Sequence, residues 1–284
     1  MQFKKITSEK QLRLIANTIR QNIIKSLVEA KSGHSAGPLG MADVFTALYF
    51  NVLKHDSKKP DWNERDKVFL SNGHICPVWY ATLAQADYFP TNELMTLRKL
   101  NSRLQGHPHY WEPPGIENSG GPLGQGISIA IGACLAAKMN KEKRRIYCLT
   151  SDGEHQEGQF MEAMMFAGNN KLDNLCVVVD RNNIQIDGDT EDIMPLEPMR
   201  AKYEADKWHV IEVDGHNIKH LIDAFEEAKT IHDMPTVIIA HTVPGKGVSF
   251  MENDYQWHGK PPTVEQGEVA LKELQEIRRQ IEEE

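Results

Sequence analysis

The 284-residue sequence contains no apolar stretch long enough to cross a membrane. Its first residues, Met1–Lys5, lead into a polar helical segment and not into the apolar core of a signal peptide. The four cysteines have no C-x-x-C spacing. Two of them, Cys148 and Cys176, lie inside apolar runs, so we expect reduced core residues. These absences favour a cytoplasmic protein.

The sequence also has no excess of basic residues, because 32 Lys and Arg stand against 40 Asp and Glu, for a net charge of −8. A nucleic-acid partner needs a basic face for its phosphate backbone, so this balance argues against nucleic acid. No internal repeat or low-complexity linker divides the chain. We therefore expect one α/β domain over residues 1–284, with a charged helical extension over about 263–284.

Short β-rich runs alternate with helix-length segments along the chain. Strands are predicted at residues 66–70, 145–150, 174–179, 209–213 and 235–240. Helices are predicted from the N-cap Ser8 to about residue 31 and at 41–53, 157–169 and 218–231, and a fully buried one at 123–139. This alternation predicts a doubly wound parallel sheet with helices on both faces.

Polar turns follow two neighbouring strands of this predicted sheet. Asp152-Gly153 lies in the turn after the second strand, and Asn182-Asn183 lies in the turn after the third. Parallel strands joined by a helix end at the same edge of the sheet, so Asp152 and Asn182 should be neighbours there. Ligands of open α/β sheets bind at this edge.

The residue types at this edge favour a metal bound together with a diphosphate. The Asp152 carboxylate and the Asn182 amide oxygen are hard ligands that suit Mg²⁺ or Ca²⁺ better than zinc. A backbone carbonyl, a water and two diphosphate oxygens would complete an octahedral shell. Gly153 leaves room for a phosphate, and the next helix points its N-terminal amides at that anion.

We single out four of the twelve histidines, each of which stands beside glycine in loop-forming sequence and not on an apolar helix face. A histidine titrates near neutral pH and can hydrogen-bond to the hydroxyls of a sugar, so together they favour a polar cleft. They are His34, His74, His107 and His258. A glycine-rich segment at 120–126 does not match a dinucleotide-binding fingerprint, because no strand immediately precedes it.

In order and spacing, these motifs resemble the transketolase family, and specifically its thiamine-diphosphate-binding part. The blocks that carry the resemblance are 32–40, 70–74, 106–108, 120–126, 152–158, 180–184 and 257–261. The resemblance implies the thiamine-diphosphate-binding fold and a subunit that binds thiamine diphosphate with Mg²⁺, for which Ca²⁺ or Mn²⁺ are possible substitutes. It implies transfer of a two-carbon ketol unit from a ketose phosphate to an aldose phosphate, as in pentose phosphate metabolism.

The resemblance also implies residue roles. The four histidines would line the substrate channel, with His107 near the hydroxymethyl group of the donor ketose and His258 near the cofactor diphosphate. The metal ligands would be Asp152, Asn182 and the backbone carbonyl of Ile184. The residues against the cofactor would be Gly121, Leu123, Gly153, Glu154, Asn182, Ile184 and His258.

Other implications concern assembly. Glu157 and Glu162 would join a carboxylate network at a subunit interface. Full transketolases continue into a pyrimidine-binding domain that completes the active site, so we expect a split enzyme with a separate C-terminal subunit, assembled as an α2β2 heterotetramer. Pro244 stands where some transketolases place a lysine, so diphosphate neutralisation would depend more on Lys246 or His258.

Three alternatives stay open at this point. A deoxyxylulose-phosphate-synthase-like enzyme shares the metal motif, although the blocks at 106–108 and 120–126 favour transketolase. The α subunit of a keto-acid dehydrogenase is also a separate chain, but it lacks this histidine set. A non-catalytic cofactor-binding subunit is the third.

Overall fold

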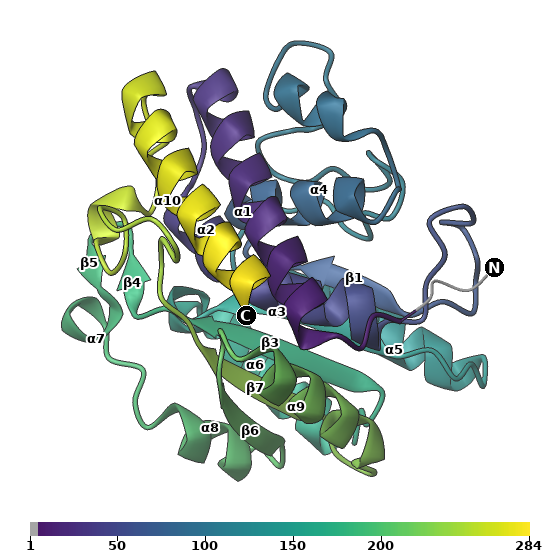
Figure 1. The fold of residues 1–284 in the computed structure, drawn as a ribbon. Helices are drawn as coiled ribbons and strands as arrows, with labels where there is room; N and C mark the ends of the chain where they lie inside the picture. Colours follow the sequence, from purple (N-terminus) through teal and green to yellow (C-terminus); the bar gives the residue numbers. More distant parts are fainter. Residues whose placement is uncertain (1–4) are drawn as a thin grey trace.

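Five parallel strands form the central sheet of the computed structural model, in the order β1-β2-β3-β7-β6 (Figure 1). The structure describes residues 5–284, so most of the amino-terminal segment examined for a signal peptide lies outside the described residues. The strands are β1 (Lys67–Leu70), β2 (Ile146–Ser151), β3 (Leu175–Arg181), β6 (His209–Asp214) and β7 (Thr236–His241). A separate two-stranded hairpin consists of β4 (Ile184–Gln185) and β5 (Gly188–Asp189).

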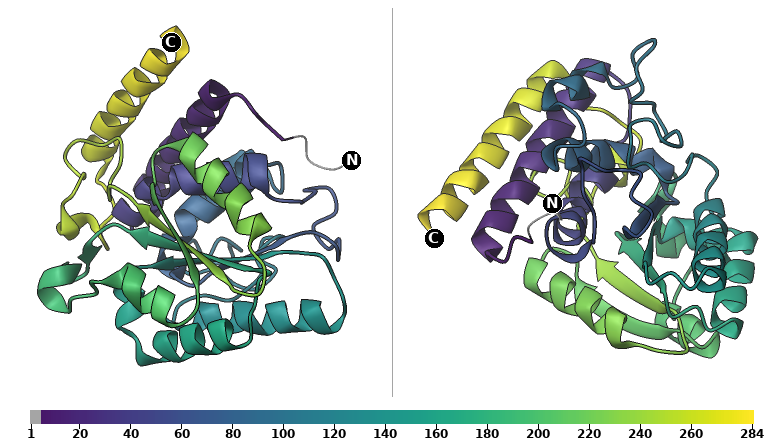
Figure 2. Two further views of the ribbon diagram at one scale, coloured as in Figure 1. Left: turned by 90° about the horizontal axis from the view of Figure 1, so that it is seen from below. Right: turned by 90° about the vertical axis from the view of Figure 1, so that its right-hand side faces the viewer.

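Helices cover both faces of this sheet (Figure 2), which confirms the predicted fold class. The helices are α1 (Glu9–Ala30), α2 (Ala36–Gly40), α3 (Ala42–Ala47), α4 (Cys76–Gln85), α5 (Gln125–Met139), α6 (Gly158–Asn169), α7 (Thr190–Ile193), α8 (Met199–Ala205), α9 (Ile218–Thr230) and α10 (Val264–Glu283). Among residues 5–284, none of the helices has the length and hydropathy that a membrane span requires.

Alternate residues of each strand pack into two separate hydrophobic cores, because successive side chains of a strand point to opposite faces of the sheet. On β2, Leu149 packs into the core beneath α1, α3, α4 and α9, and its neighbour Cys148 packs into the core beneath α5, α6 and α8. All four cysteines are buried free thiols, as predicted for Cys148 and Cys176. The sheet is thus buried on both sides, and its polar groups emerge at the strand ends.

The helix predicted over 41–53 is α-helical only over Ala42–Ala47 and continues as a π-helix over Leu48–Val52. The other predicted helices form with shifts of one or two residues at their ends, but one further expectation is wrong. The helix predicted over 123–139 begins at Gln125 and is not fully buried. Ile127 and Cys134 face the sheet and are buried, whereas Ile129 is 45% and Met139 is 82% exposed. The physical reason is that α5 packs its inner face on the strands while its outer face has no covering element among the described residues.

The C-terminal helix α10 lies along α1, and the two helices are side by side in all three ribbon views (Figures 1 and 2). Its Leu274 and Ile281 are buried, and the Asn17 amide of α1 donates a hydrogen bond to the Leu274 carbonyl at 2.9 Å. A capping box at Thr263 and Gln266 begins this helix. Apolar and polar contacts thus hold α10 against α1.

Candidate active site

A cavity of about 450 Å³ opens at the carboxyl ends of β2 and β3, and we call it the histidine cavity. It brings together side chains from seven separate loops or helix ends. The predicted site residues that line it are His34, His74, His107, Gly121, Leu123, Gly153, Glu154, Glu157, Asn182, Ile184 and His258, with Ser151, Gln156, Gln185 and Ile186 in addition. Asp152 lies fully buried beneath it, and Glu162 is exposed on α6 outside its lining.

The register of β2 and β3 places the two polar turns side by side, as the sequence predicted. Ser151 pairs with Asp180, so the residues that follow each strand meet at one edge. The Asp152 carboxylate accepts hydrogen bonds from the backbone N–H groups of Gly153 and Asn183, both at 2.7 Å. It also forms an ion pair with Arg181 at 3.0 Å. A buried carboxylate is therefore held in one orientation between Ser151 and Gly153, which both line the cavity.

Asn182 is oriented by a second buried carboxylate that the sequence interpretation did not single out. Its amide nitrogen donates to Asp180 at 2.8 Å, and Asp180 also accepts from the hydroxyl of Thr242. The amide oxygen of Asn182 accepts from the backbone N–H of Ile184 at 3.0 Å. Because the nitrogen is committed to Asp180, the oxygen is the atom of Asn182 that can bind a cation.

The charges at this edge suit a divalent cation. Arg181 would oppose a cation at Asp152, but its guanidinium is also paired with Glu191 at 2.6 Å and Glu197 at 3.0 Å. Asp152, Glu191 and Glu197 together outweigh the single charge of Arg181, so the group carries an excess of negative charge. No cluster of three His, Cys, Asp or Glu side chains in the described part of the chain is placed to hold a metal. A metal here would thus use one carboxylate, one amide oxygen and one backbone carbonyl, completed by ligand oxygens, which fits Mg²⁺ bound with a diphosphate.

Three of the four predicted histidines form a contacting cluster in the cavity wall. The ring centroids of His34 and His74 are 4.9 Å apart, those of His74 and His258 are 5.1 Å apart, and those of His34 and His258 are 5.6 Å apart. Burial lowers the pKa of His34 to about 4 and also lowers the pKa values of His74 and His258. These imidazoles are therefore neutral at pH 7 and can both donate and accept hydrogen bonds.

One buried atom in this cluster has no partner within the protein. The Nδ1 atom of His34 makes no hydrogen bond to any described residue, and both side-chain polar atoms of the fully buried Asn72 are in the same state. Buried polar atoms are costly to leave unpaired. An unpaired imidazole nitrogen in the wall of the histidine cavity fits a bound polar ligand.

Arg98 holds two of the histidine-bearing loops together, and the sequence interpretation missed it. Its guanidinium donates to the hydroxyl of Ser32 at 2.9 Å and to the carbonyl of Gly106 at 3.2 Å. These residues precede His34 and His107 by two positions and one position. Burial first, and then the charge of Arg98, lowers the pKa of His107. A lone arginine in an irregular segment had no sequence signal that pointed to this role.

Glu154 joins two further segments to its own turn, and the resemblance also implies that it contacts the cofactor. Its carboxylate accepts from the hydroxyl of Ser71 after β1, from the N–H of Gly124 at 2.6 Å and from the N–H of Ser151 at 3.3 Å. Burial raises its pKa to about 7. A Cβ on Gly126 would lie 2.5 Å from Ser71, so the first turn of α5 can approach β1 only with glycine there. Glu154 thus supports the glycine-rich wall while also lining the cavity.

The expectation for Lys246 is not met. Lys246 does not line the histidine cavity and faces a different one, between α1 and α10. His258, the alternative, does line the histidine cavity. Lys246 lies between Gly245 and Gly247 in the loop after β7, where φ values of +79° and +88° turn the chain, and its ammonium group lies 3.7 Å from Glu252.

Comparisons with known proteins agree with this geometry. A family model described as the thiamine diphosphate binding domain of transketolase matches residues 11–276. The 6-deoxy-6-sulfo-D-fructose transketolase subunit SqwG of Clostridium sp. (strain MSTE9) is 41% identical, over 94% of this chain and 98% of that protein. An apulose-4-phosphate transketolase subunit from Phocaeicola vulgatus is 39% identical, over 96% of this chain and 97% of that one.

The fold comparison extends to a solved structure. A crystal structure of a transketolase from Campylobacter jejuni superimposes with a TM-score of 0.88 at 35% identity. That match covers 96% of this chain but only 43% of the solved chain. This chain thus spans less than half of that transketolase, and it spans nearly all of the two subunits.

Proposed function

The chain belongs to the transketolase family, in which it matches the thiamine diphosphate binding domain, and from this we propose that it is the cofactor-binding subunit of a two-chain transketolase. The observation that carries the proposal is the meeting of four histidines with the Asp152–Asn182 edge in one cavity. The proposed reaction moves a two-carbon ketol unit from a ketose phosphate, or a sulfonated or deoxy analogue, to an aldose phosphate in the cytoplasm.

The donor set at the floor of the histidine cavity defines the proposed cofactor contacts. Asp152, Asn182 and the carbonyl of Ile184 would hold Mg²⁺, with Ca²⁺ or Mn²⁺ as substitutes. The cofactor would lie against the residues that share this wall, namely Gly121, Leu123, Gly153, Glu154, Asn182, Ile184 and His258. When bound, thiamine diphosphate supplies the nucleophilic carbon and electron sink that two-carbon transfer requires.

The histidines would bind and orient the donor sugar. His34, His74 and His258 are neutral at pH 7 because burial lowers their pKa values, so each can hydrogen-bond to a hydroxyl as donor or acceptor. The unpaired Nδ1 of His34 is one such position. His107, which is less buried than these three, would contact the hydroxymethyl end of the donor and move protons there.

Two features favour a partner subunit. The described residues that line the histidine cavity include no lysine or arginine, so a sugar phosphate or sulfonate would need cationic groups from another chain. In addition, α5 and α6 expose an apolar face in which Ile129 is 45%, Met165 is 53% and Phe166 is 47% exposed. Glu162 is also exposed on α6, so we propose that this face meets a second copy in an α2β2 assembly, with Glu157 and Glu162 at the contact.

Calorimetric titration of thiamine diphosphate with Mg²⁺ tests the assignment, on this chain alone and mixed with a candidate pyrimidine-domain subunit. We expect saturable, Mg²⁺-dependent binding in the mixture and a loss of at least tenfold in Asp152→Ala, because a charged metal ligand is removed. Asp192→Ala, an exposed aspartate on α7, is the matched control and should bind as the wild type does.

Two results would contradict the proposal. Equal affinity in Asp152→Ala and Asp192→Ala would place the metal elsewhere, provided that far-UV circular dichroism shows both variants folded. Complete ketol transfer by this chain alone, measured by following the aldose product, would contradict the two-chain arrangement while leaving the cofactor site intact.

A further inference from the structure

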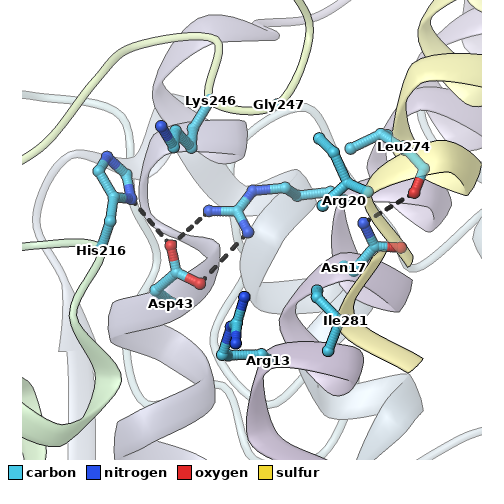
Figure 3. A pocket seen from close by; sticks show the side chains of 10 residues that line it. Arg13, Asn17, Arg20, Asp43, His216, Lys246, Gly247, Leu274 and Ile281 are labelled. Carbon is cyan, nitrogen blue, oxygen red and sulfur yellow. Dashed lines mark hydrogen bonds and ion pairs between the residues drawn. The ribbon is translucent and has the colours of Figure 1, made fainter. Parts of the chain in front are cut away.

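A second cavity, of about 200 Å³, lies between α1 and α10, and we call it the α1–α10 pocket (Figure 3). It shares no lining residue with the histidine cavity. One wall is apolar and consists of Leu274, Ile277 and Ile281 of α10. The other sides carry charged side chains from α1, α3 and the loop after β7, as Figure 3 shows.

The only carboxylate in the lining of this pocket, among the described residues, is already neutralised. The Asp43 carboxylate accepts hydrogen bonds from both terminal nitrogens of the Arg20 guanidinium, with N–O distances of 3.2 and 2.5 Å. Both side chains are less than 10% exposed. Asp43 also accepts from Nδ1 of His216 at 2.8 Å, while Nε2 of His216 accepts from the backbone N–H of Val243 at 2.8 Å. This pattern makes His216 a neutral tautomer, so Arg20 and Asp43 together contribute no net charge.

The remaining cations of the pocket, Arg13 and Lys246, are paired with glutamates that are partly exposed to solvent. Both terminal nitrogens of Arg13 donate to the carboxylate of Glu284, and the two side chains are 37% and 54% exposed. Lys246 is 38% exposed and lies 3.7 Å from Glu252, whose same oxygen already accepts from the N–H of Gly247 at 2.9 Å. Exposed ion pairs contribute little to stability, so an incoming anion can take the place of either glutamate.

We infer that the α1–α10 pocket binds a small organic dianion, with one carboxylate or phosphate group at Arg13 and a second at Lys246, which lie on opposite sides of the Arg20–Asp43 pair in Figure 3. The arginine offers a planar pair of donors and the lysine a point charge, a combination that suits either group. The short apolar part of the ligand would lie against Ile277 and Ile281. This site is separate from the proposed catalytic cavity and does not depend on the transketolase assignment.

Two probes test the site on the full chain, in the absence of Mg²⁺ and thiamine diphosphate. Succinate carries carboxylates and a hydrocarbon segment, whereas inorganic phosphate carries the anionic group alone. We expect saturable calorimetric binding of at least one probe, tighter for succinate because its methylenes can contact α10. Arg13→Met and Lys246→Met should each weaken binding about tenfold or more, as expected for loss of a charge-assisted hydrogen bond.

Arg279→Met is the matched control, because Arg279 is an exposed arginine of α10 that pairs with Glu276 and does not line the pocket. It should leave the affinity unchanged. Since all three substituted side chains are at least one-third exposed, the variants should remain folded. The absence of saturable binding of both probes to the wild type would overturn the inference. Equal weakening in Arg279→Met would overturn it too, since binding would then reflect overall charge.

Discussion

Replacing Asp43 with asparagine should be among the most destabilising polar changes in this protein. Asp43 stands at the centre of a buried network with Arg20 and His216, and the substitution keeps its shape while removing its charge. Burial alone would raise the pKa of Asp43, but the charge of Arg20 and the hydrogen bonds from His216 and Arg20 outweigh it. They lower the pKa from 3.8 to about 2. The variant leaves the Arg20 guanidinium buried without a counter-charge.

Two routes give the size of the effect. Lowering the pKa of Asp43 from 3.8 to about 2 corresponds to roughly 2 kcal/mol of stability at neutral pH. Removing one partner of a buried ion pair typically costs about 3–5 kcal/mol, because the other charge stays desolvated. The first figure is smaller because a protonated Asp43 would still accept hydrogen bonds. We therefore expect Asp43→Asn to lose about 3 kcal/mol in the free energy of unfolding.

Urea denaturation followed by circular dichroism measures this loss, with Asp223→Asn as the control. Asp223 is 61% exposed in an ion pair with Lys219, and its loss should cost less than about 1 kcal/mol. The double variant Arg20→Met/Asp43→Asn should be more stable than Asp43→Asn, since it leaves no unpaired buried charge. A loss below about 0.5 kcal/mol in Asp43→Asn, or no recovery in the double variant, would refute the reasoning.

The pH dependence of the same variant gives an independent check. The folded-state pKa of Asp43 lies below the unfolded value of 3.8, so its contribution is complete above about pH 4 and disappears as the pH falls toward 2. The stability difference between wild type and Asp43→Asn should therefore be constant from pH 5 to 7 and should shrink below about pH 4. If the stability difference between wild type and Asp43→Asn instead grew as the pH fell, the folded-state pKa of Asp43 would lie above its unfolded value and not below it.

Three further substitutions should have distinct effects. Arg98→Met should raise the Michaelis constant for the donor sugar about tenfold, with a smaller change in kcat. It should also raise the pKa of His107 in an NMR titration, because a nearby positive charge is lost. An unchanged His107 titration would argue against the contact between Arg98 and the His107 loop. Gly168→Ala should lower the urea midpoint by an amount equivalent to about 2 kcal/mol or more, because its Cβ would lie 1.8 Å from a backbone oxygen after α8. Gly132→Ala on α5, whose Cβ would meet no atom within 4 Å, should be neutral or stabilising and is the control. Phe166→Glu should keep the fold but reduce self-association in analytical ultracentrifugation, and an unchanged sedimentation coefficient would exclude the α5–α6 face as the contact.

Much of the fold could be predicted from local pattern, because a buried parallel strand has a short apolar run and a polar turn at its end. The turns at Asp152 and Asn182 were placed at one edge by topology alone, and the hydrogen bond from Asn183 to Asp152 shows that they meet. The histidine loops were grouped by their glycine neighbours and by the family resemblance. The structure brings His34, His74, His107 and His258 into one cavity.

The contacts between segments that are distant in sequence were decided only by the tertiary structure. Arg98 reaches Ser32 across 66 residues, and Glu154 accepts from Gly124 across 30. Nothing in the local sequence specifies either partner. Likewise the outer face of α5 is exposed although its composition is apolar, because composition reports hydrophobicity but not which side another element covers. Sequence thus determined which chemistry gathers at the strand ends, and the packing of distant loops determined how rigidly, and in which cavity, each side chain is held.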